Sequence, residues 1–484
     1  MSRRENGHME QDFFLKRFVC VCLALMAFLM ALLSAFHLLQ DGALWALLPA
    51  VILFLALLLL YRKPRLSAIR TGILIFAAAF VLKAIFALAV DTQPMYDFAR
   101  HLEAAQRIAG GEWDALNDYL VYQIWSYQSF FVIWMALLIK LFGAGVTFFK
   151  LTNCVFSALS SLFIYLIARK FAGEWGGRIG AIVYTLFPGS FLLIPVLTNQ
   201  HMAECLMLAA VLVFTSENRR VWAFAGALLC LSNLIRPAGL VMLAAVGVLF
   251  VQRLIYDLIK KRPKESLPLL KKIVVLFASY FVLAAVASWA VQASGLNDNG
   301  LGNVYPEWKF IVGLNPESGG NWNQTDFDLV YGEEATDESV AALYAERLSI
   351  SPGALIRLMG HKLMVMWGQY ETDYWTFQHL QGSTVFGSIS FDALIQVVLR
   401  LTGGLYVCYN LLIAAGAVGA LRKREKSLGM LLLTLMVLCY FSVQLLVEVQ
   451  VRYRSLMTAV SAPLAGAGAV YVRERLDAAL RRRR

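Results

Sequence analysis

Two carboxylates stand in the first long polar segment of the chain, residues 91–127. Asp91 comes directly after the apolar run 73–90, and Asp97 follows shortly after it. A carboxylate at a water-membrane boundary stays ionised, so either side chain could take a proton from an acceptor hydroxyl. The alternatives are a solvated helix cap for Asp97 and an interfacial anchor for Asp91. We predict that Asp97 is the base, because an amphipathic helix expected over residues 98–109 would fix its direction.

A second polar group lies at the start of a later apolar run. It consists of Asn199, His201 and Glu204, within residues 198–204, which we expect to form an external turn. Glu204 could assist a metal or a hydroxyl, or it could be an acid that the positive end of a helix dipole favours. His201 has only Glu204 as a co-ligand at helical spacing, so the two do not define a metal site.

Polar and cationic side chains form a third group between the last two apolar runs. They are Glu448, Gln450, Arg452, Tyr453 and Arg454. Two guanidiniums at an external interface can bind a phosphate through forked hydrogen bonds, and Arg236 could join them from a proline hinge. The alternative is that the arginines snorkel to lipid headgroups. Cations are normally scarce in external loops, so their presence here favours phosphate binding.

Composition indicates an integral membrane protein. The chain is 59% hydrophobic and 15% charged, with a mean hydropathy of +0.64, which is too apolar for one soluble core. The net charge of +11 falls in short clusters beside apolar runs, and no nucleic-acid motif accompanies it. We therefore interpret the charge as a topology signal and a contact with the bilayer. All seven cysteines lie in apolar segments, where packing is the expected role.

The hydropathy pattern predicts an all-α polytopic protein with about twelve transmembrane helices and a small external subdomain. The expected crossings are residues 18–39, 44–61, 73–90, 151–168, 179–197, 202–214, 221–235, 237–251, 273–291, 395–421, 428–447 and 456–472. Basic clusters at 61–65, 260–264 and 422–426 place those loops and both termini in the cytoplasm. The short run 130–142 is expected to be interfacial or partly inserted, because a further crossing would break this topology.

Four regions follow from this pattern. Residues 1–70 form an extra N-terminal transmembrane hairpin, and residues 71–293 form a core whose first external loop is 91–127. Residues 294–392 form the external subdomain and interfacial helices, with a helix at 338–348. Residues 393–484 hold the last transmembrane helices and a basic cytoplasmic tail.

The order of several short segments resembles the GT-C membrane glycosyltransferases. It is most similar to the bacterial branch related to protein mannosyltransferases and lipid A aminoarabinose transferases. The segments are Asp97 ahead of Glu103-Ala-Ala-Gln-Arg-Ile-Ala-Gly-Gly111, Thr198-Asn-Gln-His-Met-Ala-Glu204, Ser232-Asn-Leu-Ile-Arg236-Pro237, residues 309–326, and Glu448 followed by Arg452-Tyr453.

The resemblance implies a hexosyltransferase-like enzyme with a polyprenyl-phosphate-linked sugar as donor. The acceptor would be an external lipid, glycan or protein, and an acidic residue of the first loop would be the base. Carried over by position, Asp97 matches the loop aspartate, and Arg452 with Tyr453 matches the motif near the lipid phosphate. The first loop lacks the adjacent Asp-Glu pair of the family, so Asp97 and Asp91 both remain candidates, with Glu204 next.

The expected reaction is a single inverting displacement, with or without a divalent metal ion. A lipid phosphate as leaving group requires no nucleotide-binding domain, in agreement with the lack of a Rossmann or P-loop motif. One alternative is a flippase or transporter for a lipid-linked saccharide, which predicts internal repeats that the sequence does not show. Another is an oligosaccharide polymerase or ligase, which shares the lipid donor and a large external loop.

Overall fold

The computed structural model describes residues 3–59, 66–237, 239–303, 307–333, 335–369, 378–380, 384–385, 389–423 and 427–482. The named secondary-structure elements of this part are helices apart from one short antiparallel pair, β1 (Thr384–Val385) and β2 (Ile389–Ser390). The all-α prediction is therefore confirmed. The basic cluster expected at 61–65 and most of the one at 422–426 lie outside the described residues.

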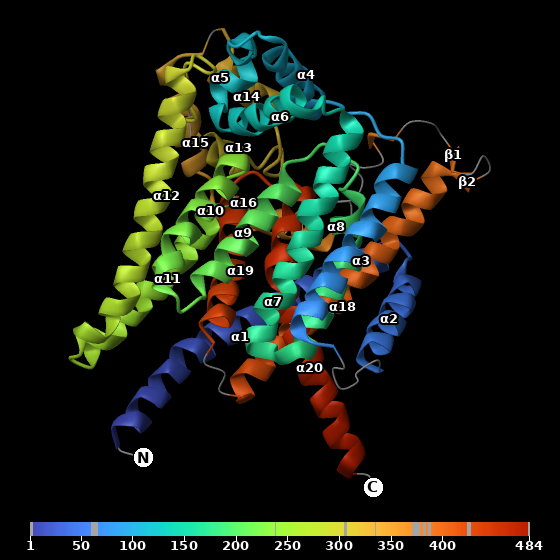
Figure 1. The fold of residues 1–484 in the computed structure, drawn as a ribbon, viewed down its shortest axis with the longest axis vertical. Helices are drawn as coiled ribbons and strands as arrows, with labels where there is room; N and C mark the ends of the chain where they lie inside the picture. The colour runs from blue at the N-terminus through green and yellow to red at the C-terminus, as the bar shows by residue number, and fades with distance from the viewer. Residues whose placement is uncertain are drawn as a thin grey trace.

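Long apolar helices form a bundle (Figure 1). Eight described helices are long and apolar enough to cross a bilayer. They are α1 (Arg3–Gln40), α3 (Ala68–Ala89), α7 (Val146–Leu186), α11 (Gly239–Ile259), α12 (Leu267–Ala293), α18 (Phe391–Lys423), α19 (Leu428–Leu446) and α20 (Arg454–Arg482). Three shorter apolar helices complete the bundle, α2 (Leu47–Leu59), α9 (Gln200–Phe214) and α10 (Trp222–Ile235). The chain is a multi-pass membrane protein.

Helix α7 is a hairpin of two antiparallel arms. Gly173 interrupts it with φ of 72°, a left-handed conformation that glycine adopts without a Cβ penalty. The second arm runs back alongside the first, because the hydroxyl of Thr185 donates a hydrogen bond to the hydroxyl of Ser161 at 2.8 Å. Counting both arms, the described residues hold twelve apolar helical segments at the positions where the hydropathy pattern predicts crossings.

The centre of the bundle is closed by small residues on α7, α18 and α20. A Cβ on Gly466 of α20 would lie 2.2 Å from the carbonyl oxygen of Gly176 on α7. A Cβ on Gly468 would lie 1.8 Å from the carbonyl oxygen of Leu412 on α18. Backbones approach this closely only when no side chain separates them, as is usual between membrane helices. These contacts fix the scaffold that carries the N-terminal end of α20.

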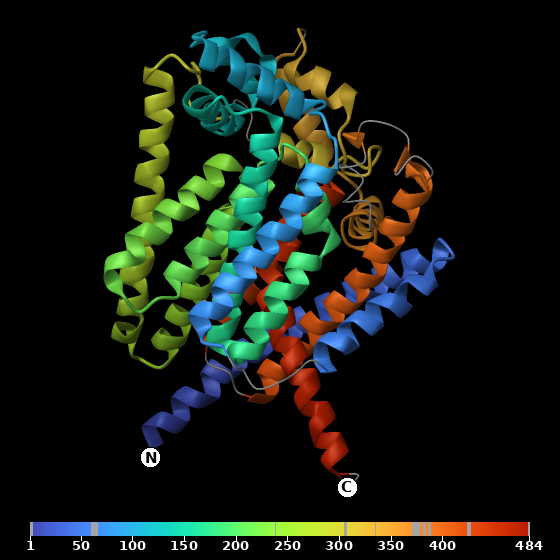
Figure 2. The same ribbon diagram turned by 45° about the vertical axis from the view of Figure 1, so that its right-hand side comes forward.

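A layer of shorter helices covers one end of the bundle, and we call this layer the cap. Its members are α4 (Asp97–Gly110), α5 (Leu120–Ile124), α6 (Ser129–Phe142), α13 (Trp308–Gly313), α14 (Gln324–Tyr331), α15 (Asp337–Leu348) and α16 (Pro352–Leu363), which the π-helical turn Met364–Gly368 extends. Both termini lie at the opposite end (Figures 1 and 2). Helix α6, expected to be interfacial or partly inserted, lies across this end beside α4 and does not run along the bundle.

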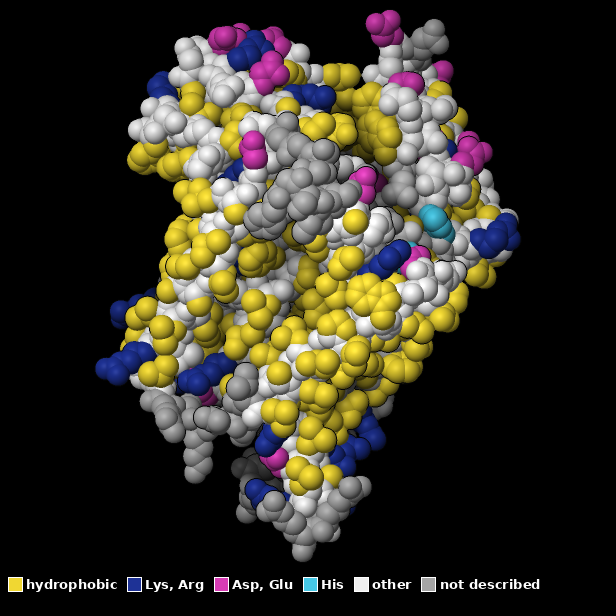
Figure 3. All heavy atoms as spheres, turned by 90° about the vertical axis from the view of Figure 1, so that its right-hand side faces the viewer, with side chains coloured by type: hydrophobic (Ala, Val, Ile, Leu, Met, Phe, Trp, Pro, Cys, Tyr) yellow, Lys and Arg dark blue, Asp and Glu magenta, His cyan; other side chains and the backbone are white. Residues whose placement is uncertain are grey.

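Short helices connect these elements. They are η1 (Leu44–Ala46), η2 (Ala115–Asp118), η3 (Ser126–Gln128), α8 (Pro188–Leu192), η4 (Arg219–Val221), η5 (Pro263–Ser266) and η8 (Val451–Tyr453). Hydrophobic side chains cover the middle of the face shown in Figure 3, and acidic side chains gather at the cap end. This distribution is what a bilayer around the bundle requires.

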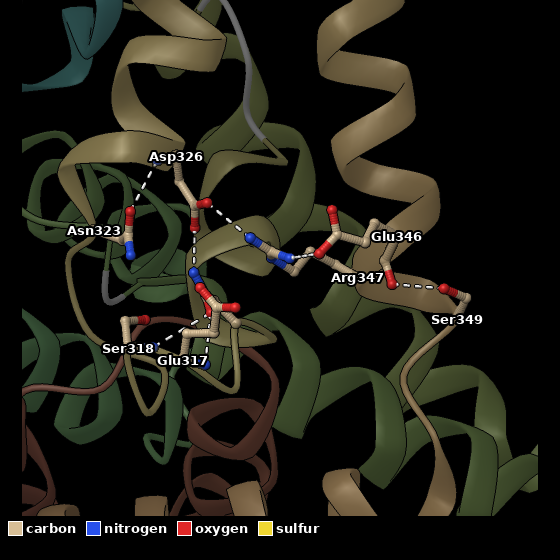
Figure 4. Close-up of polar contacts among 8 residues, drawn as sticks. Glu317, Ser318, Asn323, Asp326, Glu346, Arg347 and Ser349 are labelled. Carbon is tan, nitrogen blue, oxygen red and sulfur yellow. Dashed lines mark hydrogen bonds and ion pairs between the residues drawn. The ribbon is translucent and has the colours of Figure 1, made fainter.

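The second half of the cap has its own polar interior, centred on Asp326 of α14. Its carboxylate accepts hydrogen bonds from Arg347 at 2.7 Å and from Asn315 at 2.7 Å (Figure 4). Asn323 caps α14 by accepting from the Asp326 amide. Helix α15 confirms the helix predicted at 338–348. The four-region division of the chain remains a prediction.

Candidate active site

Helix α4 presents Asp97 at the start of an amphipathic helix, as the sequence predicts. The side chains of Phe98 and His101 are buried. The Asp97 side chain is 55% exposed and forms an ion pair with Arg100 at 3.2 Å. The preceding residue, Tyr96, has φ of 53°, which is a strained conformation for a residue with a Cβ. Such a conformation persists only where the surrounding structure holds it in place.

Asp91 lies in a different setting, where α3 has just ended. It is exposed, and Lys150 donates to the neighbouring carbonyl of Val90 at 3.1 Å. Thr92 donates to the carbonyl of Pro195 at 2.7 Å, which ties this segment to the bundle. These contacts suit the anchoring role of Asp91 that the sequence left as an alternative.

The segment between α19 and α20, residues 447–453, forms the centre of the candidate site, and we call it the 447–453 loop. Glu448 is buried, forms an ion pair with Lys309, and accepts from Gln450 at 2.6 Å. Burial acts to raise the pKa of Glu448, but Lys309 and Gln450 outweigh it and hold the pKa below its usual value. The carboxylate is therefore ionised and held in place.

Two guanidiniums from distant segments converge on Tyr453. Arg236, the C-terminal cap of α10, lies 5.1 Å from the centre of the Tyr453 ring, and Arg452 lies 5.7 Å from it. Asn199 holds Arg236 by accepting from its guanidinium at 3.1 Å. Gln200 donates to the carbonyl of Arg452 at 2.8 Å. Asn199 of the second group is thus linked, through Arg236, to Tyr453 of the third.

Arg452 also connects this cluster to α4. Its guanidinium lies 6.0 Å from the centre of the Phe98 ring, next in sequence to Asp97. Burial lowers the pKa of His101 to about 4; Asp97 opposes this effect, while Arg100 and Arg452 add to it. The proposed base and the proposed phosphate ligands therefore lie at the same end of the bundle and on adjoining elements.

Glu204 and His201 lie deeper than the sequence analysis expects. The turn ends at Asn199, and α9 begins at Gln200, so both side chains are inside the helix and buried. Glu204 accepts from the hydroxyl of Tyr184 at 3.1 Å. The expectation of an external turn over 198–204 is therefore wrong beyond Asn199, because the polar residues pack inward on the first turns of α9.

Arg454 does not join the cluster at Tyr453 either. It is buried at the start of α20, where it donates to the carbonyl of Gln369 at 2.5 Å and lies 3.7 Å from the ring centre of Tyr406. The sequence places Arg452 and Arg454 in the same interfacial group, but the turn η8 aims them in different directions. The second guanidinium beside Tyr453 is instead that of Arg236.

Sequence reasoning missed two members of the site. Lys309 was seen only as part of a longer resemblance, and Gln200 only as part of the turn. Lys309 could not be assigned because its partner, Glu448, is far away in sequence. Burial acts to lower the pKa of Lys309, but Tyr453 and Glu448 raise it above its usual value. Lys309 therefore adds a third cation to the described cluster, paired directly with Glu448.

The residues present do not form a metal cage. In the described part of the chain, no three His, Cys, Asp or Glu side chains come close enough to hold an ion together. Asp97 and Glu448 belong to separate ion pairs, with Arg100 and Lys309. The steps derived below therefore use the side chains of the chain itself.

Comparison with known proteins gives one family match. Residues 128–291 match the profile of the dolichyl-phosphate-mannose-protein mannosyltransferase family. The match runs from the start of α6 to the end of α12, and includes Asn199, Glu204 and Arg236. The resemblance to protein mannosyltransferases is therefore confirmed over this segment. No curated protein matches the chain.

Solved structures with a similar arrangement share little sequence with the chain. The Archaeoglobus fulgidus oligosaccharyltransferase in complex with Zn and sulfate has 15% identity and a TM-score of 0.45, with 82% of this chain and 49% of that chain covered. Cupriavidus metallidurans ArnT bound to undecaprenyl phosphate has 15% identity and a TM-score of 0.34, with 82% of this chain and 77% of that chain covered. The chain spans about half the length of the archaeal oligosaccharyltransferase.

Proposed function

Since residues 128–291 resemble the protein mannosyltransferases, we propose that the chain is a membrane glycosyltransferase. Its donor is a sugar linked to a polyprenyl phosphate, and its acceptor is a hydroxyl group on the cap side. The observation that carries the proposal is the convergence of Arg236 and Arg452 on the Tyr453 ring, beside the start of α4. Guanidiniums bind phosphate oxygens through forked hydrogen bonds, so two of them at one ring support a phosphate site here.

The position of the cluster suits a lipid-linked donor. Arg236 caps a helix of the bundle, and Arg452 directly precedes another, so both cations lie where the apolar bundle meets the cap. A polyprenyl chain would remain in the bilayer, its phosphate would lie at the arginines, and its sugar would enter the cap. Asp97, on the cap side, would then face the acceptor.

The reaction that these residues support is one inverting displacement. Asp97 takes the proton of the acceptor hydroxyl while the acceptor oxygen forms a bond to the anomeric carbon. The bond from that carbon to the phosphate oxygen breaks at the same time, and polyprenyl phosphate leaves with the electron pair. Arg236 and Arg452 stabilise the charge that develops on the leaving oxygen. Tyr453 lies against both cations, and Asn199 accepts a hydrogen bond from Arg236.

The test is transfer by purified protein in lipid nanodiscs, supplied with a polyprenyl-phosphate-linked hexose and a hydroxyl acceptor. We expect one sugar to be transferred, with anomeric inversion, and the double variant Arg236→Gln/Arg452→Gln to lose donor binding and transfer. Arg107→Gln is the matched control, because Arg107 is a cap arginine paired with Glu112 and Asp118 away from the cluster.

Two other outcomes would each indicate a different class of protein. Movement of the lipid-linked sugar across the bilayer without transfer would indicate a flippase. Transfer of a whole oligosaccharide would indicate a polymerase or ligase. Full activity in the double variant would show that the arginines do not bind the donor, and would overturn the proposal.

A further inference from the structure

Lys362 lies at the point where the cap meets the 447–453 loop. It is in the last turn of α16, and only 1% of the residue is exposed. Its ammonium donates to the carbonyls of Gly313 at 2.8 Å, Leu445 at 2.7 Å and Val447 at 2.7 Å. Neither the sequence patterns nor the proposed reaction uses this residue. The role of this buried ammonium and its three hydrogen bonds therefore remains to be assigned.

The three contacts match the chemistry of an ammonium. A protonated lysine has three N–H donors, and here each meets one carbonyl. The carbonyls lie at the C-terminal ends of α13 and α19, where a helix leaves oxygens without partners and carries partial negative charge. Burial lowers the pKa of Lys362 to about 8, and Glu448 opposes this effect. The charged form thus dominates at neutral pH.

The cap and the loop also touch through backbone alone. The amide of Glu448 donates to the carbonyl of Lys309 at 3.0 Å, and the amide of Val449 donates to the carbonyl of Gly320 at 2.9 Å. A Cβ on Gly313 would lie 2.3 Å from the carbonyl carbon of Val447, so the two backbones are in direct contact. The loop therefore has no room to shift unless the cap shifts with it.

We propose that Lys362 is a positioning residue, through which the cap sets the place of Glu448 and Arg452. This inference rests on the proposed function, because it concerns the loop that would hold the donor phosphate. Lys362 touches neither donor nor acceptor. It fixes residues 445 and 447, and the chain then reaches Arg452 in a few residues. A displacement of about 1 Å in such a group can reduce the rate about a hundredfold.

A buried lysine could also contribute to stability alone, so the test compares two variants. Lys362→Met removes the three donors and leaves their carbonyls unpaired. Asp326→Asn weakens the polar interior of the cap, where the partners of Asp326 are Arg347, Asn315 and Asn323 (Figure 4). Both changes destabilise the cap, and only the first releases the 447–453 loop.

The first measurement is hydrogen exchange at the amides of Glu448 and Val449, which needs no substrate. We expect Lys362→Met to speed their exchange at least tenfold and Asp326→Asn to leave it unchanged. The second measurement is transfer. We expect kcat to fall about ten- to a hundredfold in Lys362→Met, with weaker donor binding, and to stay within threefold in Asp326→Asn.

Gly313→Ala is the second variant, in case Lys362→Met does not fold. Alanine favours a helix, but its Cβ pushes against Val447 while Lys362 stays in place. It should reproduce the faster exchange and the lower kcat. Unchanged exchange in both loop variants, or equal losses in Asp326→Asn, would overturn the inference. If the wild-type protein transfers no sugar, the proposed function fails, and the exchange comparison still decides the role of Lys362.

Discussion

Replacing Asp97 with asparagine separates its charge from its shape. The amide keeps the size and hydrogen-bonding reach of the side chain but cannot accept a proton from a hydroxyl. If Asp97 is the general base, the rate of transfer should fall about a hundredfold to ten-thousandfold. This corresponds to a barrier higher by roughly 3–5 kcal/mol.

The structure predicts a much smaller effect on folding. The Asp97 side chain is 55% exposed, and its partner Arg100 is 3.2 Å away on the same helix face. Exposed pairs of this kind stabilise by about 0–1 kcal/mol. A negative charge in the first turn of a helix adds about 0.3–1 kcal/mol. The free energy of unfolding should therefore fall by less than about 2 kcal/mol, and the protein should remain folded.

The assay measures single-turnover transfer and thermal unfolding on the same nanodisc samples. Asp118→Asn is the control, because it also breaks an ion pair on the cap, with Arg107 at 2.5 Å. It should lose similar stability and no activity, and Asp91→Asn should be less affected than Asp97→Asn. If Asp91→Asn loses turnover and Asp97→Asn keeps it, Asp91 is the base and Asp97 is not. Full turnover in both would move the base to Glu204.

Three further outcomes follow from the site and the fold. Arg452→Ala should weaken binding of polyprenyl phosphate in native mass spectrometry, and Arg452→Lys should recover only part, because an ammonium cannot make the forked contact; equal affinity in all three proteins would contradict this. Glu448 has a pKa below its usual value in the folded protein, so its stabilising effect is complete above the unfolded value of about 4.3 and is lost as the pH falls through the folded pKa. Glu448→Gln should therefore flatten the acid side of the curve of Tm against pH, and an unchanged curve would show that the pair with Lys309 does not stabilise the fold. Single cysteines at Gln324 and Lys261, both exposed, should react from opposite sides of the membrane, and labelling from one side would refute the predicted topology.

The crossings could be predicted because each is a local property of the chain. Runs of apolar residues near bilayer length gave the helices of the bundle, and the amphipathic spacing after Asp97 gave α4. Gly173 could not be recognised as the turn of a hairpin, because a glycine between two apolar runs is equally compatible with a loop. Its role depends on the left-handed conformation that the second arm imposes.

The site could be predicted only in its parts. The types of Arg236 and Arg452 suggested phosphate binding, but their meeting at Tyr453 depends on how α10 and α20 pack. Lys309 and Lys362 gave no sequence signal, since each finds its partners across a large separation in the chain. The burial of Glu204 likewise follows from the packing of α9 against α7, which the hydropathy of α9 alone does not contain.

The central place of α20 has a consequence for how the protein is made. This helix packs against α7, α9, α18 and α19, all of which precede it in the chain, and Arg452 lies in η8 just before its first turn. Chains emerge from the ribosome in sequence order, and contacts between distant segments must wait for the later one. The earlier helices are therefore made before α20 is present to pack between them. Until α20 is inserted, Arg452 and Tyr453 have not reached Arg236, so a partly synthesised chain lacks the assembled cluster at Tyr453.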